Sequence, residues 1–336
     1  MNCAKFGLPT WMVGGLLINL LWLIPAWGAK YVPAKAAFSV RCNDVIFGYE
    51  VQALFLLPGE TVDIEILDAN WHSRYGFQPV SGTVQAKHER QWRWTLPEKT
   101  GLVTAQIYQI PSGQRVTLNA LVMVPYAELH HGRLRGCRIG DYPEPRQIGG
   151  AFYAPPRGFV EVTPTAMQLP VSPHFTLGQF VCKEPGGFPK YLVLDERLVV
   201  KLEALLERVN SQGYRCRSLG ISCGYRTPRY NAQQGYSSYS SHMYGQAADI
   251  YADTDGTGLM GDLNHDGRRD ERDAKIIGGM VENLEGTARH QDLVGGLGLY
   301  ETNRGHGTFV HVDVRGARAR WENVSGHAPH KKSSEN

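Results

Sequence analysis

Residues 240–250 read SSHMYGQAADI, a stretch that places His242 and Asp249 seven residues apart. A second segment, FVHVDVR at residues 309–315, contributes His311. Two histidines and one carboxylate form a three-ligand set that leaves a coordination position open on zinc. Hydrolytic zinc sites need such a position, because the ion activates water there. If the three side chains meet in the fold, the sequence predicts a metal-dependent hydrolase.

The length and composition describe an ordinary globular protein. A chain of 336 residues is long enough for two domains. The formal net charge of +3 is too small to indicate nucleic-acid binding, and we expect no nucleic acid among the partners.

The N-terminal residues 1–28 have the pattern of an export signal. Lys5 supplies the positive start, residues 11–24 are almost uninterruptedly apolar, and small residues precede a cut near Gly28/Ala29. The alternative is a retained anchor that crosses the membrane once, because apolar runs of this kind approach the length of a membrane-spanning helix. We expect an exported protein of the periplasm or cell envelope.

Five cysteines remain after the signal, and export makes disulfides permissible. Cys42 and Cys137 bracket the first domain and could close it, while Cys216 and Cys223 flank one short strand and could also pair. Cys182 is then left over. The odd count requires a free thiol or an intermolecular bridge, and the connectivity stays open.

Residues 29–124 have the pattern of an all-β, immunoglobulin-like sandwich, because short apolar runs alternate with Pro-Gly and Ser-Gly turns. Trp92 and Trp94 fall on one face of a predicted strand. This spacing favours a sandwich core, with a carbohydrate platform as the alternative. Residues 125–170 are rich in Pro, Gly and Arg and are expected to be a connector that packs against both domains.

Residues 171–321 are expected to form an α+β domain, followed by a disordered tail at 322–336. An amphipathic helix is predicted over 194–213, because its leucines keep one face. Further elements are expected as a strand at 218–223, a helix starting at 227–228, and strands at 249–251, 297–300 and 308–314.

The zinc motif resembles the zinc D-Ala-D-Ala carboxypeptidase and dipeptidase family, whose fold is shared with the hedgehog signalling domain. The resemblance rests on residues 240–249, on HVD at residues 311–313, and on CGYRTP at residues 223–228, and it covers about residues 171–321. It implies that His242, Asp249 and His311 bind Zn²⁺. It also implies that Arg226 contacts the substrate near the scissile carbonyl, and that the substrate is the D-Ala-containing stem peptide of peptidoglycan.

Two positions depart from the family pattern. Cys223 stands where the family has Ser, and Thr308 stands where dipeptidase members carry a Glu, three residues before the last His. A hydroxyl cannot serve as the general base. His306 is our preferred base, and Asp313 is the second candidate because it shares the strand face of His311. The alternative role of Asp313 is to orient a metal ligand by a hydrogen bond from outside the metal site.

A second metal signal lies inside an insert at 253–285. Residues 262–273 place oxygen ligands and a glycine, Gly267, at the spacing of a calcium loop, and an apolar-faced helix follows at 274–284. The pattern resembles half of an EF-hand or dockerin and predicts a structural Ca²⁺; an acidic turn without an ion is the alternative. The predicted ligands are Asp262, Asn264, Asp266, the backbone carbonyl of Arg268, Asp270 and Asp273.

The sequence therefore predicts an exported zinc peptidase that acts on peptidoglycan stem peptides, as a carboxypeptidase or an endopeptidase. The alternative is a non-catalytic, zinc-stabilised binding module of the cell wall, which the missing Glu before His311 keeps open. The N-terminal domain is expected to position the enzyme or to bind a protein or wall partner.

Overall fold

The computed structural model describes residues 30–68, 72–303 and 305–323. The predicted export signal at 1–28 and most of the predicted tail at 322–336 lie outside these residues. Within them, no helix has the length and apolarity that crossing a membrane requires.

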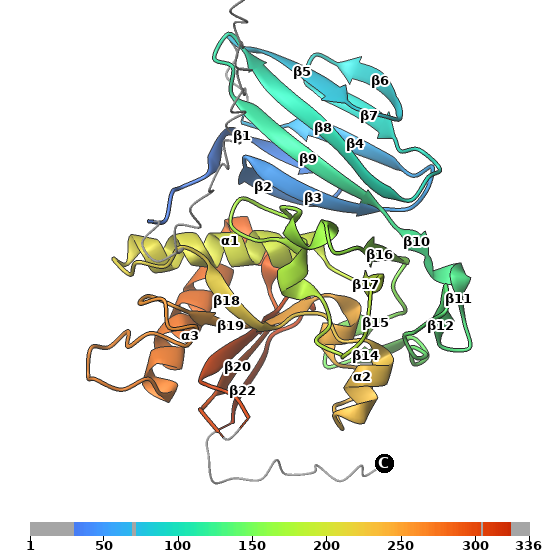
Figure 1. Cartoon of the computed structure of the whole chain (residues 1–336). Helices are drawn as coiled ribbons and strands as arrows, with labels where there is room; N and C mark the ends of the chain where they lie inside the picture. Colours follow the sequence, from blue (N-terminus) through green and yellow to red (C-terminus); the bar gives the residue numbers. More distant parts are fainter. Residues whose placement is uncertain (1–29, 69–71, 304, 324–336) are drawn as a thin grey trace, which may run out of the picture.

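The N-terminal part consists of two β-sheets that share one apolar core (Figure 1). Trp94 is fully buried in that core and Trp92 nearly so, which agrees with the core interpretation of this pair. All strand pairs are antiparallel except β3 with β9. One sheet has the order β2 (Val45–Tyr49), β1 (Lys35–Cys42), β4 (Thr61–Ile66), β7 (Gln91–Thr95), β6 (Thr83–His88); the other has the order β3 (Val51–Leu56), β9 (Arg115–Val122), β8 (Gly101–Ile110), β5 (Arg74–Pro79).

The segment expected to be a connector is built of short strands and contributes to the core of the C-terminal part. Phe159 and Val160 are buried in the same cluster as the C-terminal helix and sheet, and the Tyr142 hydroxyl lies 2.9 Å from that of Tyr225. The elements between β9 and α1, which extend past the predicted connector, are β10 (Val124–Pro125), η1 (Tyr126–Glu128), β11 (Leu129–His130), β12 (Arg133–Leu134), β13 (Cys137–Arg138), β14 (Arg146–Ile148), β15 (Ala151–Tyr153), β16 (Gly158–Val162), η2 (Ala166–Gln168), η3 (Leu177–Phe180) and β17 (Lys190–Leu192).

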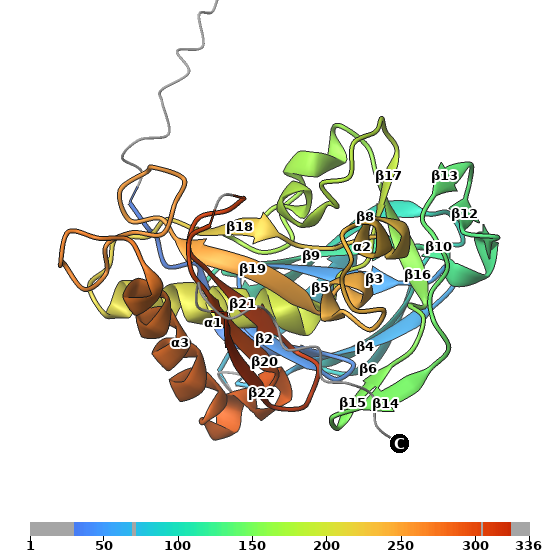
Figure 2. The ribbon, with the colours of Figure 1, turned by 90° about the horizontal axis from the view of Figure 1, so that it is seen from below.

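The C-terminal part is a five-stranded mixed sheet with helices α1 and α3 packed against one face (Figures 1 and 2). The sheet order is β18-β19-β21-β20-β22, and β20 and β22 are parallel. The predicted helix and strands are all present, with ends that differ by a few residues. The elements are α1 (Glu196–Ser211), β18 (Leu219–Cys223), α2 (Pro228–Gln233), η4 (Ser241–Tyr244), β19 (Ala247–Ala252), α3 (Glu271–Glu285), η5 (Ala288–Leu293), β20 (Gly296–Tyr300), β21 (Phe309–Asp313) and β22 (Ala319–Asn323).

Helix α1 lies between the N-terminal sheets and the C-terminal sheet (Figure 1). Its first residue, Glu196, accepts a hydrogen bond from the backbone N–H of Phe55 on β3 at 2.7 Å. Burial, followed by the nearby Asp195, raises the pKa of Glu196 to about 7. Phe55 belongs to the same buried apolar cluster as the core residues of the C-terminal part. The two parts therefore share a packed interface at this point.

The buried Lys201 fixes α1 against the end of the sheet that carries His311. Its ammonium donates to Glu285 Oε1 at 2.6 Å, to the carbonyl of Leu293 at 2.9 Å and to the carbonyl of Asp313 at 2.7 Å. A buried ammonium is costly unless it is paired and hydrogen-bonded. These three bonds therefore tie α1 to the end of α3, to η5 and to the end of β21, the strand that carries His311.

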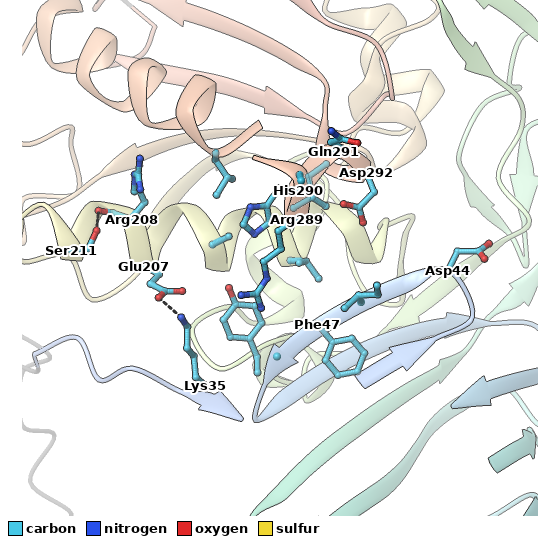
Figure 3. Close-up of a pocket in the computed structure, with 18 residues that line it drawn as sticks. Lys35, Asp44, Phe47, Glu207, Arg208, Ser211, Arg289, His290, Gln291 and Asp292 are labelled. Atoms are coloured by element: carbon cyan, nitrogen blue, oxygen red, sulfur yellow. Dashed lines mark hydrogen bonds and ion pairs between the residues drawn. The ribbon is translucent and has the colours of Figure 1, made fainter. Parts of the chain in front are cut away.

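A pocket of about 530 Å³ lies between the first strands and helix α1 (Figure 3). Lys35 and Glu207 form an ion pair of 2.5 Å at its edge, and Arg289 and His290 of η5 lie on another side. None of the predicted site residues lines this pocket.

The proposed disulfides are wrong for this structure, in which all five cysteines of the described residues are free. Cys42 is buried in the N-terminal core, whereas the thiol of Cys137 lies 3.6 Å from the carbonyl of Pro189. The thiol of Cys216 donates to the carbonyl of Ser218 at 3.2 Å ahead of β18, whereas Cys223 is the last residue of that strand. The strand Leu219–Cys223 alone spans roughly 13 Å, whereas a disulfide requires Cα atoms within about 7 Å.

Candidate metal centre and cleft

The predicted zinc ligands converge on one face of the C-terminal sheet, although they come from three separate elements. Asp249 on β19 and His311 on β21 are Cα partners, so their side chains share a face. His242 comes from η4, the turn that leads into β19. Gly245 ends this turn with φ 68°, and a Cβ there would lie 2.4 Å from the carbonyl oxygen of Val193, so the turn requires glycine.

Three atoms of these side chains form a tight triangle. His242 Nε2 lies 3.2 Å from His311 Nδ1 and 3.2 Å from Asp249 Oδ1, and the last two atoms are 2.9 Å apart. All three residues are buried. A tetrahedral ion with bonds of about 2.1 Å sets its ligand atoms roughly 3.4 Å apart. The spacing therefore fits a zinc ion held by two imidazoles and one carboxylate.

The outer hydrogen bonds of the two rings turn their lone pairs toward the triangle. His242 Nδ1 lies 2.6 Å from the carbonyl oxygen of Gly224, which only accepts, so Nδ1 carries the hydrogen. His311 Nε2 lies 3.1 Å from Asp313 Oδ2 and donates to it in the same way. Such outer partners orient metal-binding histidines and fix their tautomers. In these tautomers three electron-rich atoms face one another, an arrangement that requires a positive charge among them.

The electrostatics of the triangle agree with this requirement. Burial raises the pKa of Asp249, but the attraction of His242 and His311 outweighs it and leaves the pKa far below the usual range. Burial lowers the pKa of His311, but the bonds to Asp249 and Asp313 outweigh it and raise the pKa. The cluster thus attracts either protons or a metal ion, and its nitrogen and oxygen donors are those that zinc accepts.

Arg226 lies beside the triangle and is held by three contacts. Its Nε donates to Cys223 Sγ at 3.0 Å, its Nη2 donates to Asp249 Oδ2 at 3.0 Å, and its guanidinium lies 4.3 Å from the centre of the Tyr236 ring. A guanidinium in this position carries a permanent positive charge at the edge of the candidate centre. It also lines the cleft described next.

A cleft of about 760 Å³ opens over the triangle and is lined by residues from five regions of the chain. The hairpin β14–β15 supplies Ile148 and Tyr153, which the sequence did not single out. No local motif marks them, because they reach the cleft only through tertiary packing. The remaining aromatic lining residues are Tyr230, Tyr236, Tyr239, Tyr300, Phe309 and Trp321.

His306 lines this cleft, and its hydrogen bonds orient the ring. The Asn303 oxygen accepts the backbone N–H groups of Gly305 and His306, so its amide nitrogen donates to His306 Nε2 at 2.7 Å. The ring packs edge-on against Phe309, with centroids 4.8 Å apart.

Asp313 is placed differently. It is fully buried, bonds His311 from behind and is paired with Arg315, and it does not line the cleft. The hydroxyl of Thr308 lies 3.0 Å from that of Thr302, also outside the cleft lining. Of the two predicted bases, His306 alone lines the cleft.

The predicted calcium loop lies between β19 and α3. Asp262 accepts the backbone N–H groups of Asp266 and Gly267, at 3.1 and 2.8 Å, and Gly267 has φ 82° as the turn requires. The fully buried Asp273 accepts the N–H of Leu263 at 2.7 Å, so the two ends of the loop meet.

The other predicted calcium ligands lie in the same turn. Asn264 Nδ2 donates to Asp266 Oδ2 at 3.1 Å, the N–H of Arg268 donates to Asp266, and Asp270 caps helix α3. Arg272 forms ion pairs with Asp266 and Asp270. The carboxylates therefore have internal partners, and no contact of the loop identifies an ion.

Comparison with known proteins gives one family match. Residues 183–260 match the family model described as Peptidase M15, a segment that contains Arg226, His242 and Asp249 and ends before His311. No curated protein shows a significant match to the chain.

Two solved structures show a limited likeness. One is a nucleoside hydrolase-related hypothetical protein from Saccharophagus degradans that is associated with carbohydrate metabolism, with 12% identity, a TM-score of 0.21 and coverage of 26% of each chain. The other is a DUF4784 family protein from Bacteroides caccae, with 11% identity, a TM-score of 0.16 and coverage of 27% of this chain and 25% of that one. The chain spans about a quarter of either structure, and at these TM-scores neither bears on the fold.

The family match and the donor cluster fall on the same residues, His242 and Asp249. The protein carries a Peptidase M15 domain, a domain of a zinc metallopeptidase family.

Proposed function

We propose that the protein is an exported zinc peptidase that hydrolyses peptide bonds in the stem peptides of peptidoglycan. The observation that carries the proposal is the triangle of His242 Nε2, Asp249 Oδ1 and His311 Nδ1 at the base of a cleft. The family match to Peptidase M15 supports peptidase chemistry, and the resemblance to D-Ala-D-Ala peptidases supports the wall substrate. The apolar run at 11–24 supports export to the periplasm or cell envelope.

In this proposal, zinc when bound supplies Lewis-acid chemistry that polarises a carbonyl and activates water. The residues around the metal site have separate roles. Asp313 and the carbonyl of Gly224 hold the two imidazoles in their metal-facing tautomers. Arg226 attracts the carbonyl oxygen of the scissile bond as negative charge develops on it. His306 exchanges the hydrogen bond that Nε2 receives from Asn303 for one from the attacking water, accepts the proton of that water and returns it to the leaving amine.

The proposed architecture is a peptidase fold of the hedgehog type over residues 171–321, preceded by an immunoglobulin-like sandwich over 29–124. The two N-terminal sheets and the mixed C-terminal sheet agree with it at the level of fold class. We propose that the sandwich positions the enzyme on the wall or on a protein partner. The alternative function, a zinc-stabilised wall-binding module, is favoured by one observation, which is that Thr308 and not a carboxylate precedes His311 by three residues.

The experiment that tests the function is a digest of purified muropeptides followed by mass analysis. A carboxypeptidase removes one terminal D-Ala from each stem, whereas an endopeptidase separates cross-linked stems. Binding of muropeptides without any change in their masses would support the binding module and contradict the peptidase.

We also propose that Ca²⁺ binds the loop at 262–273, at the six ligands named from the sequence. The calcium-loop spacing of the oxygen-bearing side chains, the positive φ of Gly267 at the turn and the closure of the loop by Asp273 support this proposal. Calcium at a hundredfold excess over its dissociation constant is expected to stabilise the fold by about 2.7 kcal/mol. The measurement is the melting temperature with and without Ca²⁺, for wild type and Asp262→Asn.

The calcium proposal predicts a rise in melting temperature for wild type and a much smaller one for Asp262→Asn. Asp44→Asn, on an exposed turn of the N-terminal sheet, is the matched control and should respond like wild type. Equal melting temperatures of the wild type with and without Ca²⁺ would mean that the loop is an acidic turn stabilised by its own hydrogen bonds.

A further inference from the structure

Cys223, which the zinc motif does not include, lies in one cross-strand row with two of the proposed metal ligands, Asp249 and His311. Across the sheet, Cys223 on β18 is the Cα partner of Asp249 on β19, which is in turn the partner of His311 on β21. Residues directly opposite one another in antiparallel strands project to the same face. Three donor residues therefore form one row across three strands.

A bulge in β18 explains how the thiol reaches this row. The pairing of β18 with β19 shifts register between Ile221 and Cys223, so the regular alternation of side chains is interrupted at the end of the strand. Bulges of this kind redirect a side chain and are common beside active sites. After the bulge, Cys223 lines the cleft together with His242, Asp249 and His311.

The sulfur lies within reach of an ion in the triangle. The donor atoms of Cys223, His242 and Asp249 all lie within 4.8 Å of one another. Two atoms that share one tetrahedral zinc ion, through bonds of about 2.3 and 2.1 Å, lie roughly 3.6 Å apart. A movement of about 1 Å therefore brings the sulfur to the ion that His242 and Asp249 would hold.

The surroundings of the thiol suit a metal-bound sulfur. Arg226 Nε donates to Cys223 Sγ at 3.0 Å, and the same guanidinium bonds Asp249 Oδ2. Arg226 thus orients two adjacent donors from outside, as outer partners of metal ligands do. Its positive charge also balances a second anionic donor beside Asp249.

We propose that Cys223 is a fourth protein ligand of the metal, which is then held by one thiolate, two imidazoles and one carboxylate. This inference rests on the proposed function only in placing a divalent metal at the triangle, and it does not require hydrolysis. With four protein donors the ion keeps no tetrahedral position for water, so hydrolysis at this site would require a fifth coordination position. A thiolate is a soft donor and favours zinc, cadmium and cobalt over magnesium or manganese. Sulfur in the donor set therefore makes the site selective for soft metals.

The test uses the full-length protein loaded with Co²⁺ and its electronic spectrum. A cobalt–thiolate bond gives an intense near-ultraviolet charge-transfer band, and nitrogen and oxygen ligands do not. We expect this band in wild type and its loss in Cys223→Ser, while the visible cobalt bands of the other ligands remain. Cys137→Ser, a thiol away from the cleft, is the matched control and should keep the band.

Competition between Cd²⁺ and Zn²⁺ gives a second measurement. We expect Cys223→Ser to lower the preference for Cd²⁺ over Zn²⁺ by at least about tenfold. Wild-type protein that binds Co²⁺ at the triangle without a charge-transfer band would overturn the inference, and this result does not depend on any variant folding. If the protein cleaves muropeptides but shows no charge-transfer band, only the assignment of Cys223 as a ligand is contradicted. If the band is present but muropeptides are not cleaved, only the proposed function is contradicted.

Discussion

Replacing His242 with alanine is expected to abolish zinc binding at the triangle and to lower turnover of muropeptides by at least about a thousandfold. A catalytic metal contributes several kcal/mol of transition-state stabilisation, and about 4 kcal/mol corresponds to that factor. His242 supplies one of three buried donors that lie 2.9–3.2 Å apart, so its loss leaves two donors and a gap. The measurements are the zinc content per chain and the rate of stem-peptide cleavage.

The control for this variant is His88→Ala, because His88 is exposed on β6 of the N-terminal sheet and lies outside the cleft. It should keep both zinc and activity. A folded His242→Ala protein that binds zinc with wild-type affinity would place the metal elsewhere and contradict the assignment of the triangle.

Replacing His306 with glutamine is expected to lower turnover by roughly 10²–10⁴-fold while the zinc content stays at the wild-type level. Glutamine can keep a hydrogen bond to Asn303 but cannot accept a proton from water. The expected effect falls on the catalytic step because His306 lines the cleft and its ring bonds Asn303 and Gly307, not the three proposed zinc ligands.

Asp313→Asn is the matched comparison, because it changes the other predicted base. Asp313 bonds His311 from behind, so its loss should weaken zinc affinity by roughly 10–100-fold. Excess zinc should then restore most of the turnover of Asp313→Asn but none of the turnover of His306→Gln. If instead zinc fails to rescue Asp313→Asn and His306→Gln cleaves as fast as wild type, the roles of the two residues are reversed.

The secondary structure around the site could be predicted because its signals are local. The predicted helix at 194–213 is α1 (Glu196–Ser211), and the strand expected at 308–314 is β21 (Phe309–Asp313). Apolar periodicity and turn residues report on such segments directly. The donors His242 and Asp249 come together for the same reason, since a single glycine turn joins η4 to β19.

Tertiary features could not be predicted in this way. Ile148 and Tyr153, which line the cleft, lie in a region whose sequence has no apolar periodicity. Their position beside the site depends on tertiary packing, which a local pattern does not reveal. Cysteine spacing suggested two pairings, Cys42 with Cys137 and Cys216 with Cys223, but all four of these thiols are free. The position of Cys223 beside Asp249 depends on a register shift between two strands, which no spacing along one strand reveals.

The measurement that tests the central claim most directly is a muropeptide digest by one preparation of the full-length protein in three states. These states are as purified with zinc, after removal of the metal by a chelator, and after zinc is restored. The account predicts product masses that report a cut stem peptide in the first state, unchanged substrate in the second and the same products again in the third. Cleavage that continues in the metal-free protein, or none in the zinc-loaded protein, would contradict it.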